Sequence, residues 1–170
     1  MPRLLPEHEV EEFYKKYVGP LFGMARRIVE SDQAAEDIVH DVFVAFILAV
    51  GRGRIDADAH PVAYLFRSVT NASFKYLRKR ATRDLAEASA VPGSIPGPSI
   101  GRIAVITALA KLSEDDQHLL TLVSFGGLSP AEIAAMLGTS EPTIRKRLQR
   151  ARARLIQALD PSSAPSTHDR

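Results

Sequence analysis

The sequence contains no cysteine, and this absence removes several kinds of chemistry at once. Without thiols the chain can form no disulfide, no cysteine-bound iron–sulfur cluster and no thiolate zinc site. It also lacks any run of about 18 or more apolar residues, the length that a membrane-spanning helix requires. No charged segment followed by an apolar stretch and a cleavage site marks a secretory signal. We therefore expect a cytoplasmic protein that does not insert into the membrane.

Charge is balanced in total but unevenly placed along the 170 residues. The formal net charge is +2, with 22 Lys and Arg against 20 Asp and Glu. Acidic residues are concentrated between residues 7 and 41, whereas arginines are concentrated late in the chain. A hydrophobic content of 45% suits one ordinary globular domain or two small helical ones. The asymmetry of charge is therefore more informative than its total.

A segment rich in proline and glycine divides the chain at residues 91–101, VPGSIPGPSIG. The segments on both sides repeat apolar residues with the period of a helix. We predict an all-α fold of two small helical domains, residues 1–83 and 102–159, joined by a flexible linker over residues 84–101. Residues 160–170 lack apolar periodicity, which is typical of a disordered tail. The expected helices cover residues 8–17, 20–30, 32–50, 61–83, 102–112, 114–125, 129–137 and 140–158.

Residues 129–140 carry the signals of two helices joined by a short turn. Ser129 can cap a helix that has Pro130 in its first turn and Glu132 at the reciprocal position of a capping box. Gly138 supplies a left-handed residue where that helix ends, and Ser140 can cap the next one. This order predicts a helix-turn-helix, whose second helix enters the major groove of DNA.

The predicted second helix has one apolar face and one cationic face. Ile144, Leu148, Ala151 and Leu155 share the apolar face and should pack inward. Residues 142–159 contain six cations and no acid, whereas a solvated helix usually mixes the two signs. Arginine and glutamine can pair with base edges, and surrounding cations neutralise phosphates. The candidate DNA-contacting residues are Thr143, Arg145, Lys146, Gln149 and Arg150.

The helix expected at residues 61–83 is basic in a different way. Its predicted outward side combines cations and an amide with one aromatic ring, and its members are Arg67, Asn71, Phe74, Lys75 and Arg78. An exposed ring among cations suits unstacked bases, because bases stack on it while the cations follow the backbone. Taken alone, the helix leaves open that Phe74 packs against a neighbouring element. Beside a helix-turn-helix, the pattern favours binding of nucleic acid.

The helix expected at residues 32–50 has an acidic surface in place of a basic one. Its predicted core side comprises Ile38, Val39, Val42, Phe43 and Phe46. The opposite side shows Asp37, Asp41, Val44 and Leu48, which we call the acidic surface. Because acidic and apolar residues are mixed on an exposed face, this surface indicates a protein partner.

Three stretches in this order resemble the extracytoplasmic-function group of sigma factors in the sigma-70 family. They are AAEDIVHDVF at residues 34–43, AYLFRSVTNASFKYLRKR at residues 63–80 and LSPAEIAAMLGTSEPTIRKRLQRARARL at residues 128–155. The resemblance covers nearly all of residues 8–158. It implies a sigma region 2-like bundle followed by a region 4-like helix-turn-helix domain. It also implies a transcription initiation factor that directs core RNA polymerase to promoters, with no catalysis, cofactor or metal of its own.

The resemblance assigns a partner to each surface. The acidic surface would contact the coiled coil of the largest polymerase subunit, and the polymerase flap is a further expected contact. The face around Asn71 would hold the opened −10 element, with residues 51–61 as a base-capture loop. The helix at 140–158 would read the −35 element. An anti-sigma factor, often anchored in the membrane, is a further expected partner and would hold the protein there.

Two other functional classes are weighed against this one. A plain helix-turn-helix regulator would bind duplex DNA without core polymerase. The adjacent His40 and Asp41 are similar to the paired metal ligands of HD-type phosphohydrolases. The remaining histidines, at positions 8, 60, 118 and 168, supply no second His-Asp pair, so the sequence does not favour this enzyme class.

Overall fold

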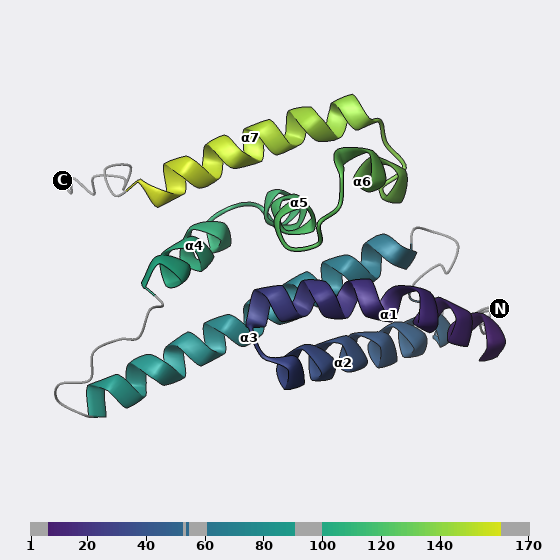
Figure 1. Ribbon diagram of the computed structural model, residues 1–170, viewed down its shortest axis with the longest axis horizontal. Coiled ribbons are helices and arrows are strands. Elements are labelled where there is room, and N and C mark those ends of the chain that lie inside the picture. The colour runs from purple at the N-terminus through teal and green to yellow at the C-terminus, as the bar shows by residue number, and fades with distance from the viewer. Residues whose placement is uncertain (1–6, 53, 55–60, 91–99, 161–170) are drawn as a thin grey trace.

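The computed structural model describes residues 7–52, 54, 61–90 and 100–160, which form the helical array in Figure 1. Within these residues the chain forms helices and no strand, so the predicted all-α class is confirmed. No described helix is both long and apolar enough to cross a membrane. The helices are α1 (Glu7–Val29), α2 (Asp32–Gly51), α3 (Pro61–Ala90), α4 (Ile100–Ala110), α5 (Glu114–Ser124), α6 (Pro130–Met136) and α7 (Glu141–Leu159).

Helices α1, α2 and α3 pack against one another and form the N-terminal bundle. An aromatic contact joins all three helices near the starts of α1 and α3 and the end of α2. The ring of Phe46 lies 5.7 Å from that of Phe13 and 5.8 Å from that of Tyr64, measured between centroids. The predicted core side of α2 is confirmed, with Val39, Val42, Phe43 and Phe46 buried and Ile38 half-buried. Ser31 caps α2 by accepting a hydrogen bond from the backbone N–H of Ala34.

Helix α1 continues through Gly19 and Pro20, where the sequence predicted a break between two helices. A proline inside a helix removes one backbone hydrogen bond and costs roughly 3 kcal/mol. Both residues lie on the exposed side of α1, so water can bond the carbonyl that loses its partner. Side chains on both sides of the proline, Tyr17 and Leu21 among them, pack on the same core. This shared packing keeps the helix continuous, and the predicted break is wrong.

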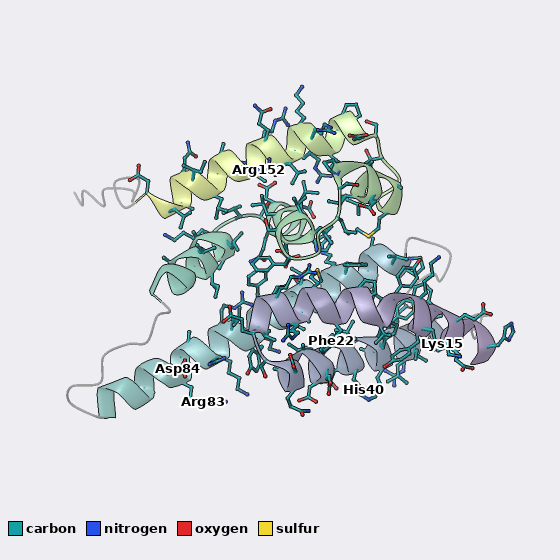
Figure 2. The ribbon with its side chains drawn as sticks, viewed as in Figure 1. Lys15, Phe22, His40, Arg83, Asp84 and Arg152 are labelled. Carbon is teal, nitrogen blue, oxygen red and sulfur yellow. The ribbon has the colours of Figure 1, made fainter. Side chains whose placement is uncertain are left out.

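Helix α3 extends to Ala90, so residues 84–90 are helical although they were expected in the linker. The segment Asp84–Ala90 is rich in good helix formers, and Arg80 pairs with Asp84 one turn on at 3.9 Å. Figure 2 labels Arg83 and Asp84 on the part of α3 that projects beyond α1 and α2. Helix α4 begins at Ile100, also inside the expected linker. Residues 91–99 and 161–170 lie outside the described residues.

Helices α4 to α7 form the C-terminal unit, in which α7 contacts α4, α5 and α6. Its core combines Leu119 and Leu122 from α5 with Ile133 from α6 and with Ile144 and Leu148 from α7. The short α6 contributes a single fully buried large side chain, so its position depends on α7.

The two units pack together through α3 and α5, and α5 lies between α7 and the bundle (Figure 1). Their buried apolar side chains form one cluster. Beside this contact, a hollow of about 620 Å³ lies between the bundle and α6, with Lys16, Phe66 and Met136 among its lining residues. The contact between the units holds charged groups as well, and these bear on the functional surfaces.

We predict that Phe46→Ala destabilises the protein by about 3–5 kcal/mol, because it removes the ring that joins the three bundle helices. Phe46 is 2% exposed, whereas Leu48 on the same helix is 50% exposed. Leu48→Ala should therefore change stability by less than about 0.5 kcal/mol. The free energy of unfolding in urea measures both variants. Equal losses in the two would show that the aromatic contact does not anchor the bundle.

Candidate nucleic-acid interface

A capping box sets the start of α6. The hydroxyl of Ser129 accepts a hydrogen bond from the backbone N–H of Glu132 at 3.2 Å. The Glu132 carboxylate in turn accepts bonds from the Ser129 N–H at 2.8 Å and from its hydroxyl at 2.7 Å. These two bonds, the backbone one first, hold the pKa of Glu132 below its ordinary value of 4.5. The predicted capping box is confirmed.

The turn after α6 has the predicted left-handed residue. Gly138 has a φ of 62°, which an L side chain rarely adopts. The next N–H, that of Thr139, donates to the carbonyl of Ala134 at 2.9 Å and closes the end of α6. Ser140 then caps α7 by accepting a hydrogen bond from the backbone N–H of Thr143 at 3.4 Å. Local sequence signals therefore fix the turn between the two helices.

Helix α7 presents its predicted faces. Ile144, Leu148 and Ala151 are buried against α5 and α6, and Leu155 is half-buried. All five predicted DNA-contacting residues of α7 are exposed, namely Thr143, Arg145, Lys146, Gln149 and Arg150. The apolar face thus fixes the rotation of α7 about its axis, and this rotation turns the cations outward.

The cations of α7 fall into two groups that the sequence did not distinguish. Arg145 bonds the Glu141 carboxylate one turn earlier, at 2.5 and 2.8 Å. Two carboxylates of α5 contact two further arginines: Asp115 lies 3.8 Å from Arg147, and Asp116 pairs with Arg154. Among the described residues no such ion pair involves the remaining three, which are Lys146, Arg150 and the Arg152 labelled in Figure 2. These three are available to phosphates without breaking a contact.

Helix α3 departs from the prediction at Phe74, which is 2% exposed and cannot offer its ring to a base. The expected outward position is wrong because α3 packs on two sides. One side faces α1 and α2, and Phe74 lies beside a hollow that Leu112 and Gln117 of the C-terminal unit also line. A helical wheel drawn for one buried face cannot show a second one. The alternative, that Phe74 packs against a neighbouring element, is correct.

The other predicted residues of α3 remain at the surface. Asn71, Lys75 and Arg78 are exposed, and together with Phe74 they line this same hollow, which has a volume of about 400 Å³. Arg67 is half-exposed and pairs with Glu114 and Asp115 of α5, a contact that the sequence did not predict. Residues 51–61, the expected base-capture loop, lie mostly outside the described residues.

The acidic surface lies on the exposed side of α2, as the pattern predicted. Asp37, Asp41, Val44 and Leu48 are all exposed, and Ile47 adds a further exposed apolar side chain.

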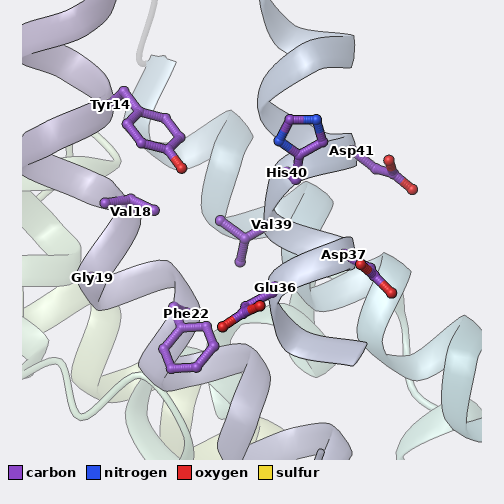
Figure 3. Close-up of a pocket in the computed structure, with 9 residues that line it drawn as sticks. All are labelled: Tyr14, Val18, Gly19, Phe22, Glu36, Asp37, Val39, His40 and Asp41. Atoms are coloured by element: carbon purple, nitrogen blue, oxygen red, sulfur yellow. The ribbon is translucent and has the colours of Figure 1, made fainter. Parts of the chain in front are cut away.

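Beside the acidic surface, a groove of about 790 Å³ runs between α1 and α2 (Figure 3). Figure 3 shows Tyr14 and Phe22 of α1 along one wall, with Asp37 and Asp41 of α2 directed away from α1. The sequence did not indicate this groove, because it depends on how α1 and α2 pack. Within the described ranges, no group of three or more His, Asp or Glu side chains is placed to hold a metal ion.

Comparison with known families agrees with this arrangement. Residues 13–83 match the family model "Sigma-70 region 2", and residues 102–155 match "Sigma-70, region 4". The chain is 32% identical to the RNA polymerase sigma factor CnrH of Cupriavidus metallidurans, over 80% of this chain and 78% of that protein. The chain belongs to the sigma-70 family. It is a sigma factor of the extracytoplasmic-function group, and it is not an enzyme.

Two further comparisons agree with this assignment. This chain is 29% identical to the ECF RNA polymerase sigma factor SigM of Mycobacterium tuberculosis, over 88% of this chain and 76% of that protein. The solved structure of CnrH in complex with the cytosolic domain of CnrY matches with a TM-score of 0.50 and 26% identity. That match covers 91% of this chain and 90% of the solved one.

We predict that Ser129→Ala raises the pKa of Glu132 part of the way toward 4.5, since the hydroxyl bond is lost while the backbone N–H remains. In this sigma factor the capping interaction is complete above pH 4.5 and is lost as the pH falls through the lowered pKa. An NMR titration of the Glu132 carboxylate measures the shift, with Ser113→Ala, the cap of α5, as control. An equal pKa in all three proteins would contradict the assigned cause.

Proposed function

We propose that this sigma factor binds core RNA polymerase through the acidic surface of α2 and contacts promoter DNA at two elements. The face of α3 contacts the −10 element, and α7 contacts the −35 element. The observation that carries the proposal is the orientation of α7. Its apolar face is buried in the core, so Lys146, Gln149 and Arg150 are exposed on the opposite face. Side chains near the start of such a helix meet the edges of bases in the major groove.

At the −10 element the proposal depends on charge and hydrogen bonding. With Phe74 buried, α3 offers the cations Lys75 and Arg78 and the amide of Asn71. Cations that follow a single strand supply binding that is insensitive to sequence. Base recognition at this element must then come from Asn71 or from residues outside α3, such as the segment 51–61. Arg67 joins this surface when its contact with α5 is broken.

For polymerase binding, the acidic surface has the composition of a protein interface. Exposed apolar side chains at Val44 and Leu48 lie beside the carboxylates of Asp37 and Asp41. Apolar groups supply most of the binding free energy, while charges set the orientation and the rate of encounter. A basic partner with apolar side chains, such as a polymerase coiled coil, fits this surface.

The proposal includes the organisation and regulation of the chain. We assign residues 1–83 to the polymerase and −10 functions, residues 102–159 to the −35 function, residues 84–101 to the connection and residues 160–170 to a tail. An anti-sigma factor is the proposed regulator, and the solved CnrH structure, which holds a cytosolic domain of CnrY, supports such a partner. The place of action is the cytoplasm, where polymerase and chromosome lie, with attachment to the membrane through that regulator.

The first test is transcription in vitro with purified core RNA polymerase on a library of genomic fragments. We expect new discrete start sites with the wild-type protein and their loss with Asp37→Arg/Asp41→Arg, since like charge would then face a basic partner. Glu11→Arg/Glu12→Arg on α1 changes the total charge equally and should leave transcription intact. A pull-down of core polymerase checks that binding is the step affected.

Two results would contradict this assignment. If the α1 and α2 variants behave alike, the acidic surface is not the polymerase contact. If the wild type gives no new transcripts but binds a defined duplex tightly by itself, the protein acts as a plain helix-turn-helix regulator.

A second test addresses the recognition helix. Arg150→Ala should reduce transcription roughly 10- to 100-fold and relax the base preference at one position of the −35 element, because a side chain that contacts a base contributes about 1–3 kcal/mol. Arg152→Ala removes the same charge further along α7 and should weaken all sequences uniformly, if it acts on a phosphate. Transcription from a library of −35 variants measures both. An unchanged base preference with Arg150→Ala would exclude Arg150 from reading bases.

A further inference from the structure

The hollow of about 400 Å³ beside Phe74 is lined by α3, by the end of α4 and by the start of α5. Its volume falls in the range of small-molecule sites, roughly 300–1,000 Å³, and near the lower end of it. A single nucleotide is a ligand of suitable size. The lining residues that bear on its chemistry are Asn71, Lys75 and Arg78 of the bundle and Leu112, Glu114 and Gln117 of the C-terminal unit.

A strip of polar side chains on α3 gives the hollow its positive charge. Asn71, Lys75 and Arg78 are spaced by four and three positions, so they lie on the same side of the helix, and all three are exposed. In the part of the chain that the structure describes, neither the ammonium group of Lys75 nor the guanidinium of Arg78 is in an ion pair. Two such cations one turn apart suit the oxygens of a phosphate group.

From α5, Gln117 brings a buried amide with an unused donor to the same hollow. Gln117 is 8% exposed, and its Nε2 has no hydrogen-bond partner among the described residues. A buried donor without a partner destabilises the structure, so a ligand atom that accepts a bond from Nε2 gains binding free energy. A carboxamide both donates and accepts hydrogen bonds, and it can pair with two atoms of an adenine edge. Gln117 therefore suits a base, whereas Lys75 and Arg78 suit a phosphate.

The remaining lining residues are compatible with a nucleotide. Ala72, Ala110 and Leu112 supply apolar surface, against which a flat base can lie. Glu114 is an anion, and alone it would repel a phosphate. Its carboxylate lies 3.0 Å from Nη2 of Arg67, so much of its charge is already compensated within the protein. The hollow thus combines a cationic side, an apolar surface and an amide, as a nucleotide site requires.

We propose that this hollow binds a free nucleoside monophosphate, with the phosphate at Lys75 and Arg78 and the base at Gln117. Residues of both units bound the hollow, so it has room for one nucleotide and not for a continuing strand. Asn71, Lys75 and Arg78 are also the proposed −10 residues. A bound nucleotide therefore competes with promoter DNA for them, and this competition rests on the proposed function.

Titration calorimetry of the full chain with AMP, at low salt and without polymerase, tests the site. We expect saturable binding of one AMP, which Lys75→Ala/Arg78→Ala weakens roughly tenfold or more. Gln117→Leu keeps the size of the side chain but removes its donor, and should weaken AMP roughly three- to tenfold. Ribose 5-phosphate carries no base, so it should bind the wild type and Gln117→Leu equally. A change confined to AMP would separate base binding from a general effect on the fold.

The matched control is Lys79→Ala/Arg80→Ala, which removes two exposed cations of the same helix that do not line the hollow. It should bind AMP nearly as well as the wild type. The site is overturned if AMP does not saturate, if both double variants lose affinity equally, or if Gln117→Leu binds AMP like the wild type. Binding of a ten-residue single strand without binding of AMP would also overturn it. The proposed function then stands if the wild type directs transcription, whereas AMP binding without transcription would overturn only that function.

Discussion

Helix α3 must pack against two partners at once, and most of the other features follow from this constraint. Leu65 and Val69 are fully buried in the bundle, while Phe74 lies beside the hollow shared with the C-terminal unit. A helix buried on two sides keeps only a narrow exposed strip for polar side chains. On α3 this strip holds Asn71, Lys75 and Arg78, which places the candidate −10 residues at the edge of a contact between units.

The carboxylates of α5 divide the cations of the protein into those held in ion pairs and those available to bind another molecule. The first turn of α5 carries Glu114, Asp115 and Asp116, and these carboxylates pair with Arg67 on α3 and with Arg147 and Arg154 on α7. They therefore neutralise arginines of both candidate nucleic-acid surfaces from a single helix end, where negative charge is also favoured by the helix dipole. Lys146 and Arg150 lie beyond their reach. The net charge of +2 conceals this division, because the paired and the available cations count equally in the total.

Local signals in the sequence predicted local structure well. The caps at Ser129 and Ser140 and the glycine at 138 act within a few residues, so the helix-turn-helix and the faces of α7 could be predicted. The continuity of α1 through Pro20, the burial of Phe74 and the pairing of Arg67 depend on segments far apart in the sequence. Arg67 and Glu114 are 47 residues apart, and no periodicity within either helix relates them. The exposed residues of α2 and α7 were predictable because one packed face decides them, whereas those of α3 were not.

Competition at Arg67 connects the fold to the proposed function. A guanidinium that pairs with two carboxylates of its own chain cannot bind a phosphate at the same time, so Arg67 joins the proposed −10 surface only when its contact with α5 is broken. The two carboxylates are 72% and 60% exposed, so these pairs are weak and are screened by salt. The apolar cluster that the two units share, in contrast, does not depend on salt screening and favours the packed arrangement.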